Sequence, residues 1–295
     1  MARVRFKGWA PYAAMLPALA TALIFYIGTI VWMAWISLTP SKLVPIYKFQ
    51  GIQNYQRLFG DARWNVSTTN VALYIVILIV FSLIVGTVLA ICLDQRVRGE
   101  NTLRTLFLYP QGMSLVVTGL IWQWILNPTS GAQYALRSFG WADAKFDWIL
   151  NPRTAIYVIC VAGVWQACGL IMAILLSGLR GVDPTLWSAA RIDGIPPWRY
   201  YLSVVIPQLR PAYITSIVLL AVGGVKVYEL VIAMTNGGPG IATEMPAKFV
   251  MDFLFRRANL GLAAAASTVM LVAVSAVVIP WIYVEFVRRR KVAAV

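Results

Sequence analysis

The sequence predicts an all-α integral membrane protein with six transmembrane helices. Of its 295 residues 60% are hydrophobic and only 12% are charged, and the mean hydropathy is +0.74. Soluble globular domains are much less apolar. Six apolar runs reach the length of about 20 residues that a helix needs to cross a bilayer. Because these runs are continuous, they favour helices over the alternating strands of a barrel.

The predicted transmembrane domain covers residues 12–287. It lies between an N-terminal segment, residues 1–11, and a C-terminal tail, residues 288–295. The six predicted spans are residues 12–38, 71–93, 105–126, 155–179, 213–235 and 263–287. The first span follows three basic residues, as a signal peptide would. It is too long and too aromatic for one and lacks a small-residue cleavage site, so we interpret it as a span.

The basic residues predict the orientation of the chain in the membrane. Lys and Arg concentrate in the N-terminal segment, in the loops after the second and fourth spans, and in the tail, while the longer alternate loops carry fewer. Cytoplasmic segments carry the excess of positive charge. Both termini and the loop of residues 183–211 are therefore predicted to be cytoplasmic. The net charge of +14 is explained mainly in this way, and no nucleic-acid partner is predicted.

The most polar stretch of the chain, residues 183–211, predicts a helix, a turn and a second helix. Asp183 suits an N-cap and Pro184 the first helical position. Gly194 suits the left-handed residue that follows a helix, and the two prolines after Ile195 prevent the helix from continuing. A second short helix is expected over residues 198–205, closed by Pro207.

This stretch resembles the cytoplasmic coupling loop of permease subunits of binding-protein-dependent ABC importers. The family pattern of Glu-Ala-Ala, Asp-Gly and Leu-Pro reads here Ser188-Ala189-Ala190, Asp193-Gly194 and Ile206-Pro207. Ser188 departs from the usual glutamate. The resemblance implies contacts with a separate ATPase through six residues: Ser188, Ala189, Ala190, Asp193, Gly194 and Pro207. The two alanines are expected to let another protein's surface approach closely.

Other motifs extend the resemblance along the chain to the carbohydrate group of this family. They are Gly51-Ile52-Gln53-Asn54-Tyr55, Arg104-Thr105-Leu106-Phe107 with Tyr109-Pro110, and Asn236-Gly237-Gly238-Pro239-Gly240. Trp165-Gln166-Ala167-Cys168-Gly169 and Lys226-Val227-Tyr228-Glu229 are similar to glucose/mannose-type permeases. The resemblance therefore implies import of a monosaccharide such as glucose or mannose. The alternatives are another carbohydrate, such as an α-glucoside, a polyol or glycerol phosphate.

The resemblance also implies the partners and the location. They are a second permease subunit, two copies of an ATPase subunit, an external or periplasmic sugar-binding protein and the lipid of a bacterial inner membrane. No lysine is followed by Ser or Thr, so the chain lacks the phosphate loop that ends in Gly-Lys-Ser/Thr. We therefore predict a non-catalytic subunit. The chain has no histidine, its cysteines fall in predicted spans, and no metal, disulfide or cofactor is predicted.

Charged residues inside the fifth predicted span are candidates for the substrate path. Lys226 and Glu229 are three residues apart, which in a continuous helix places them on one face. A charge at that depth is costly unless it is paired or faces water. The predicted polar wall also includes Tyr228 and the pair Gly223-Gly224. The alternative is a structural ion pair that does not meet the substrate.

Trp122 and Gln166 complete the predicted path, with Gln123, Trp124 and Asn127 as further candidates. Aromatic rings stack on sugars and amides bond to hydroxyl groups. The alternatives are that the tryptophans anchor span ends and that the amides bridge helices. Two other functions remain open. An ion-coupled secondary transporter would need carboxylates in its spans, where Glu229 is the clear case, and a membrane enzyme would need clustered catalytic groups.

Overall fold

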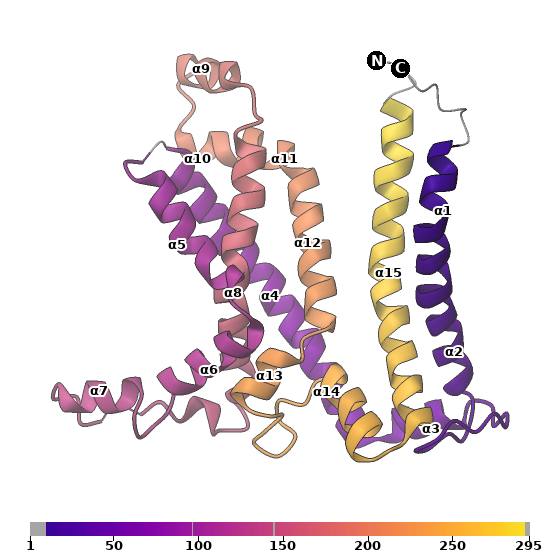
Figure 1. Cartoon of the computed structure of the whole chain (residues 1–295). Coiled ribbons are helices and arrows are strands. Elements are labelled where there is room, and N and C mark those ends of the chain that lie inside the picture. Colours follow the sequence, from indigo (N-terminus) through magenta and orange to yellow (C-terminus); the bar gives the residue numbers. More distant parts are fainter. Residues whose placement is uncertain (1–9, 96, 144, 293–295) are drawn as a thin grey trace, which may run out of the picture. The chain divides into compact units, whose positions relative to one another are not determined.

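The computed structural model describes residues 10–95, 97–143 and 145–292, and side chains within residues 15–283 of these ranges. The described chain is helical and contains no strand (Figure 1). Two compact units are present, one of residues 1–61 and 250–269 and one of residues 62–249 and 270–295. Residues 1–9 of the predicted N-terminal segment and 293–295 of the predicted tail lie outside the described residues.

The α-helices of the structure are as follows in chain order: α1 Ala10–Ala22, α2 Gly28–Ile36, α3 Gln53–Gly60, α4 Ala62–Asp94, α5 Glu100–Gly112, α6 Leu115–Ile125, α7 Ala132–Ser138, α8 Ala155–Leu179, α9 Pro184–Ile192, α10 Pro197–Tyr200, α11 Ile206–Gln208, α12 Arg210–Val225, α13 Glu229–Met234, α14 Pro246–Met251 and α15 Leu260–Val292. Wider π-helical turns connect some of them, at Leu23–Ile27, Tyr201–Val205 and Asp252–Arg256, and a 3-10 turn covers Asp147–Ile149.

The all-helical membrane architecture is confirmed. Four described helices are long and apolar enough to cross a membrane unbroken, at Met15–Ile36, Ala62–Asp94, Ala155–Leu179 and Leu260–Tyr283. Two helix pairs, Glu100–Gly112 with Leu115–Ile125 and Pro197–Gln208 with Arg210–Val225, are bent by 99° and 70° and bring the total to six if each pair is one span. The first of these bends breaks the third predicted span, and the gap between α12 and α13 breaks the fifth.

The third predicted span breaks between α5 and α6. Met113 is extended and Ser114 caps α6, with its hydroxyl accepting from Val117 N at 3.5 Å. The break leaves helix-end carbonyls without intrahelical partners, and Gln166 of α8 donates its amide N–H to the Met113 carbonyl at 3.1 Å. A polar side chain on a neighbouring helix is a known means of satisfying freed backbone groups in membrane helices.

The fifth predicted span is also wrong as a continuous helix. α12 ends at Val225 and α13 begins at Glu229. The half-helices α6 and α13 pack closely against each other, since a Cβ at Gly119 would lie 2.5 Å from Ala233 Cβ. Packing of this kind depends on small residues, which let two helix backbones approach. This packing stabilises α6 and α13 as separate short helices. The apolar pattern of the sequence had predicted each of them as part of a longer span.

In the first unit, Asn54 of the Gly51–Tyr55 motif joins α3 to the turn after α2. Asn54 of α3 is buried and donates to the carbonyls of Ser37 and Thr39 at 2.9 and 2.7 Å. The start of α15 joins the same turn, because Gly261 N donates to Ser41 O at 2.8 Å. A Cβ at Gly261 would approach Thr39 O to 2.6 Å, so only glycine allows this contact.

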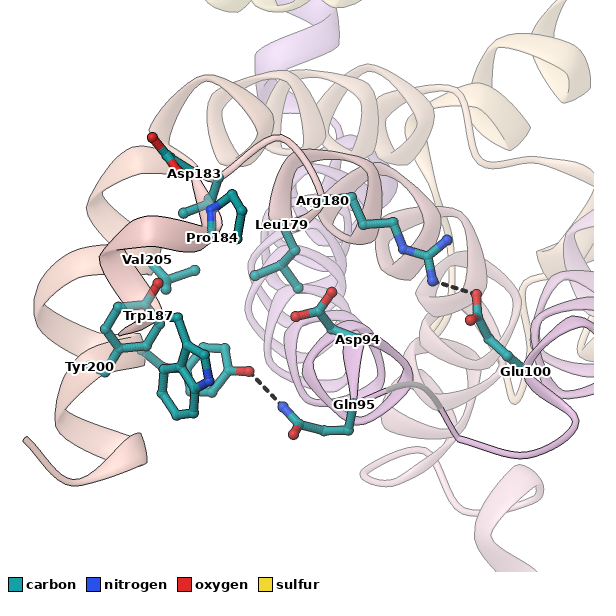
Figure 2. A pocket seen from close by; sticks show the side chains of 12 residues that line it. Asp94, Gln95, Glu100, Leu179, Arg180, Asp183, Pro184, Trp187, Tyr200 and Val205 are labelled. Atoms are coloured by element: carbon teal, nitrogen blue, oxygen red, sulfur yellow. Dashed lines mark hydrogen bonds and ion pairs between the residues drawn. The ribbon is translucent and has the colours of Figure 1, made fainter. Parts of the chain in front are cut away.

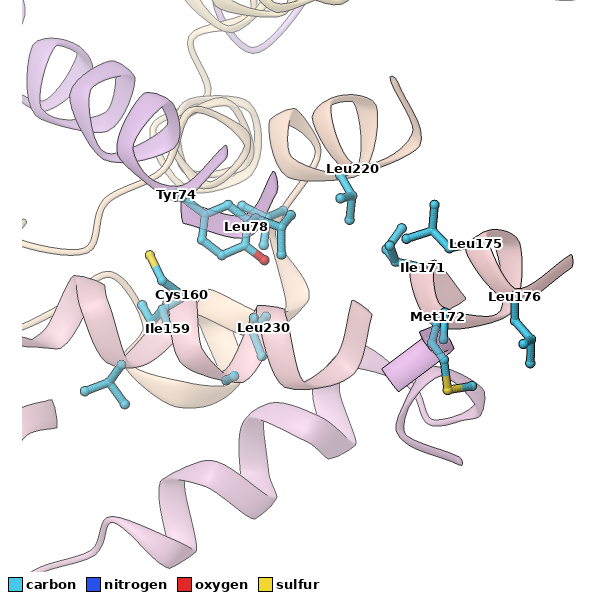
Figure 3. Packing of buried hydrophobic residues seen from close by; sticks show 14 of the residues in the cluster. Tyr74, Leu78, Ile159, Cys160, Ile171, Met172, Leu175, Leu176, Leu220 and Leu230 are labelled. Atoms are coloured by element: carbon cyan, nitrogen blue, oxygen red, sulfur yellow. The ribbon is translucent and has the colours of Figure 1, made fainter. Parts of the chain in front are cut away.

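The core of the second unit lies between α4 and α8, with α5, α12 and α13 against them. Figure 3 shows side chains of this core, among them Leu78, Ile171, Leu175, Leu220 and Leu230. Glycines bring the helices together. A Cβ at Gly86 would lie 2.7 Å from Ile171 Cγ2, and one at Gly169 only 1.9 Å from the carbonyl oxygen of Phe107 in α5. Close backbone packing therefore positions the polar loop that follows α8.

Candidate functional site

The polar loop begins with α9, whose start is formed as predicted. Asp183 is the N-cap and its Oδ1 accepts from Thr185 N at 2.9 Å, while Pro184 occupies the first turn. Hydrogen bonds from Thr185 to the carboxylate lower the pKa of Asp183, because they stabilise its charged form. The cap thus holds a charge that also suits the positive end of the helix.

The end of α9 at Gly194 is likewise confirmed. Gly194 has φ +68°, a left-handed conformation that residues with a side chain adopt at a cost. Ile195 N donates to Ala190 O at 2.9 Å and Gly194 N to Arg191 O at 3.2 Å. These two bonds form the Schellman motif, which satisfies carbonyls that the last turn leaves free. The turn between α9 and α10 is therefore specified by one glycine.

The second helix of the loop differs from the prediction. It was expected over residues 198–205 with Pro207 as its end, but helical structure runs from Pro197 through Gln208 and the bend falls at Leu209. Pro207 lies in the first turn of α11, where a proline's missing N–H costs little. The π-helical turn Tyr201–Val205 directly precedes α11, so the helical path continues through Pro207 to Gln208.

A cleft of about 740 Å³ lies between α9 and the helix ends next to it. Figure 2 shows it from close by, with Trp187 and Tyr200 on the side of α9 and α10, and Asp94 and Gln95 on the side of α4. The end of α8 contributes Arg180. The cleft separates α9 from the ends of the spans, so only contacts along its edges connect them.

One contact inside the loop, one between the loop and α4, and one between the ends of two spans lie around this cleft. The rings of Trp187 and Tyr200 lie 4.9 Å apart and so link α9 to α10. Gln95, next to the end of α4, donates to Tyr201 Oη at 2.6 Å. Arg180, after α8, pairs with Glu100 of α5 at 2.5 Å, although exposed ion pairs of this kind add little stability. α9 is thus connected through α10 to α4 and is not an isolated appendage.

The exposed surface of the loop includes large apolar side chains among its polar ones. Four large side chains on α9 to the π turn are exposed by 37 to 86%, namely Leu186, Ile192, Trp198 and Leu202. Ser188, Ala189 and Asp193 are exposed as well. The prediction that Ala190 contacts a partner protein is wrong. Its side chain is only 5% exposed and belongs to the core. An exposed apolar patch on a segment outside the spans is typical of a protein interface.

The charges of the fifth span lie at the break between α12 and α13. Lys226 is the C-cap of α12 and Glu229 lies in the first turn of α13, where the helix ends stabilise a cation and an anion respectively. Both are partly exposed. The prediction that they share one helical face is wrong, since no continuous helix joins them. No ion pair within 4.0 Å joins these two residues, both of which the structure describes.

The other predicted path residues divide into two groups. Gly223 is open, with nothing within 4 Å of the point where a Cβ would lie, and Tyr228 is half-buried at the N-cap of α13. Gly224 instead packs against α4, where a Cβ would lie 2.6 Å from Ile75 Cγ1. Gln166 is buried and bonds to Met113, and Trp122 packs edge-on against Trp165 at 6.1 Å. Gly224 and Gln166 therefore serve helix packing here.

A second cleft, of about 410 Å³, contains two further candidates, Gln123 and Asn127, opposite residues 234–239. Asn127 is engaged locally, since its Oδ1 accepts from Thr129 N at 2.9 Å. Three polar residues that the sequence did not indicate as a cluster meet at the end of the segment between α13 and α14. They are Arg63, Asn70 and Glu244. Among the described side chains no group of His, Cys, Asp and Glu is arranged to hold a metal ion.

The chain matches known proteins along most of its length. Residues 82–292 match the family model of the binding-protein-dependent transport system inner membrane component. The chain belongs to this family. The match covers the helices α5 to α15 and residues 183–211, which we call the coupling loop after the motif they resemble, and confirms the family that this motif predicts.

Relatives of similar length support the assignment. A probable ABC transporter permease of Pyrococcus horikoshii is 35% identical over 91% of this chain and 93% of its own. The trehalose/maltose transport system permease protein MalF of Thermococcus litoralis is 26% identical over 94% of each chain. In fold, the chain is similar to a solved bacterial ABC transporter involved in alginate import, with a TM-score of 0.79, 17% identity and 96% of both chains covered.

Proposed function

We propose that this chain is the permease subunit of an ATP-driven carbohydrate importer and that the coupling loop transmits movements of a separate ATPase. The exposed apolar surface of Leu186, Ile192, Trp198 and Leu202 carries this proposal, because it lies on a loop outside the spans and calls for a protein partner. The loop is preformed by its caps and joined to α4 through Tyr201 and Gln95. A push on α9 therefore reaches a span.

The proposed assembly contains a second permease, two copies of the ATPase and an external sugar-binding protein, in a bacterial inner membrane with both termini cytoplasmic. Family membership supports the dependence on a binding protein. A related solved transporter was crystallised in complex with an alginate pentasaccharide-bound periplasmic protein. The bound nucleotide and the loaded binding protein then act on the same two-state arrangement of spans, so each changes the affinity for the other.

The proposed cargo is a sugar, and specifically a monosaccharide such as glucose or mannose. Relatives are named for trehalose and maltose, xylose and arabinose and sn-glycerol-3-phosphate, which are carbohydrates or close derivatives. The path is proposed to pass the break between α12 and α13, where Gly223, Lys226 and Glu229 are at least partly exposed. Broken helices that present their ends are a common basis of transport sites.

The proposal is tested by isolating the tagged protein gently from its native membranes and identifying its companions by mass spectrometry. A second six-span permease and an ATPase at twice the copy number are expected. Recovery of the chain alone or as a homo-oligomer from well-preserved membranes would overturn the proposal. Proton- or sodium-driven sugar uptake by the protein alone would then identify a secondary transporter.

The charges at the break are expected to contribute to sugar binding. Lys226→Met and Glu229→Gln should each raise the sugar concentration for half-maximal import about tenfold, because a hydrogen bond to a charged group contributes about 1.5–3 kcal/mol. The measurement is uptake of labelled sugar by vesicles containing the complete importer. In the double variant the two losses should add. A double variant no worse than either single one would indicate a structural pair and remove both residues from the path.

A further inference from the structure

A second exposed apolar surface lies in the first unit, on the irregular segment between α2 and α3 (Figure 1). Single exposed apolar residues are normal on a protein, but a dense group of them marks an interaction surface. Large side chains within residues 43–52 are 47 to 79% exposed. We call them the apolar patch: Leu43, Val44, Ile46, Tyr47, Phe49 and Ile52. Neither the coupling loop nor the proposed sugar path includes any of them.

The apolar patch is held outward by the fold of its own segment. Gln50 N donates to Leu38 O at 2.8 Å, which folds the segment back onto the residues after α2. Ile46 N donates to Ser41 Oγ at 2.9 Å, and Ser41 is buried. These bonds order the segment before any partner binds. The apolar side chains therefore need a cover that comes from outside the segment.

The apolar patch continues the exposed surface of the first span, Met15–Ile36. Trp32 and Trp35 of α2 are 44 and 46% exposed, and the ring of Phe49 lies 6.3 Å from that of Trp35. Tryptophan is enriched where a span passes from hydrocarbon to the lipid headgroups. The contact between Phe49 and Trp35 therefore places the patch at the level of the headgroups.

The charges beside the patch favour an anionic lipid surface. Lys42, Lys48 and Arg57 are exposed, and residues 42–59 contain no acidic residue. Basic residues among aromatic and aliphatic ones are typical of segments that lie in the membrane interface, and each lysine near the surface strengthens the attraction to anionic lipids. A deeper position is excluded, because irregular backbone that faces lipid does not occur in the hydrocarbon region.

We propose that residues 42–52 lie in the membrane interface at the end of the first span. The apolar patch contacts the acyl chains, and Lys42 and Lys48 bind the phosphates of anionic phospholipids. This inference goes beyond the proposed function, since it assigns a lipid site and does not depend on the cargo. The segment fixes the depth of the first span in the bilayer, because displacing the span would draw the apolar patch into water.

The test uses the protein isolated with its companions and reconstituted in lipid nanodiscs. A fluorophore is attached at Tyr47→Cys in a Cys92→Ser background, because Cys160 and Cys168 are buried. Lipids brominated near the headgroup end of the acyl chain should quench this label, and aqueous iodide should quench it only weakly. Quenching by iodide alone would place the patch in water, and quenching by neither would place it under a protein. Either result overturns the proposal.

Ile192→Cys is the matched control, since Ile192 is an apolar residue of the coupling loop that is 86% exposed. It lies on a surface proposed to meet a protein, so brominated lipid should not quench a label there. Equal quenching at the two positions would overturn the assignment to residues 42–52, because exposure alone would then explain the signal.

The headgroup is tested by comparing brominated phosphatidylglycerol with brominated phosphatidylcholine at equal mole fractions. The anionic lipid should be enriched at the Tyr47 label, and Lys42→Gln and Lys48→Gln should each reduce this enrichment about fivefold. High salt should weaken the enrichment as well. Arg191→Gln, at an exposed position of α9, should leave it unchanged. Equal quenching by the two lipids in the wild-type protein would overturn the assignment of Lys42 and Lys48 to anionic headgroups.

Discussion

Gly169→Ala is expected to prevent the second unit from folding stably. The added Cβ would lie 1.9 Å from the carbonyl oxygen of Phe107 and 2.7 Å from its carbonyl carbon. These are backbone atoms of α5, so no side-chain rotation relieves the clash and the two helices have to separate. Overpacking typically costs about 1–3 kcal/mol and occasionally more. We expect at least about 3 kcal/mol here, or about 10 °C in Tm.

The measurement is the yield and thermal unfolding of the purified protein in detergent. Gly223→Ala is the matched control, because Gly223 also lies within a helix but has nothing within 4 Å of its Cβ position. That variant should unfold at or slightly above the wild-type temperature, as alanine favours helices over glycine. A Gly169→Ala protein as stable as the control would show that α5 and α8 do not pack through their backbones at this point.

Gly194→Val is expected to abolish sugar import while ATP hydrolysis continues. Valine at φ +68° is strained by about 1–3 kcal/mol, and relaxing this strain breaks the hydrogen bonds from Gly194 and Ile195 that end α9. In the proposed function, α9 then no longer carries movement of the ATPase to α10 and α4. The measurement compares import and ATP hydrolysis in the same proteoliposomes.

Gly194→Asn provides the control for this experiment. Asparagine tolerates the left-handed conformation better than other residues with side chains, so import should remain close to wild type. Nothing lies within 4 Å of a Cβ at this position, and the two variants therefore differ in backbone preference and not in packing. Intact coupled import in Gly194→Val would contradict the role given to the end of α9.

The sequence was most informative where structure depends on neighbouring residues. Asp183, Pro184 and Gly194 determine the ends of α9, because capping involves only hydrogen bonds within a few residues. The prediction for Pro207 failed for a related reason. A proline excludes an interior helix position but is tolerated in a first turn, and the π-helical turn before it decides which of these applies.

The candidate path residues show where reading the sequence reaches its limit. Gln166 was a candidate for binding sugar or for bridging helices, and its bond to Met113 O shows that it bridges. Gly224 was predicted to face the path and instead packs on Ile75. Both roles depend on which neighbouring helix lies opposite, and the local sequence contains no information about that neighbour.

The sequence by itself determined that the chain is a helical membrane protein with six apolar stretches and a capped helix after the fourth. These features follow from transfer of side chains to lipid and from local hydrogen bonding. Only the tertiary structure decided that two spans break, that α6 and α13 pack together at Gly119, and that Arg63 meets Glu244 across 181 residues of sequence. Such contacts depend on the close approach of distant backbones and on mutual satisfaction of buried polar groups, which arise only once the helices are packed.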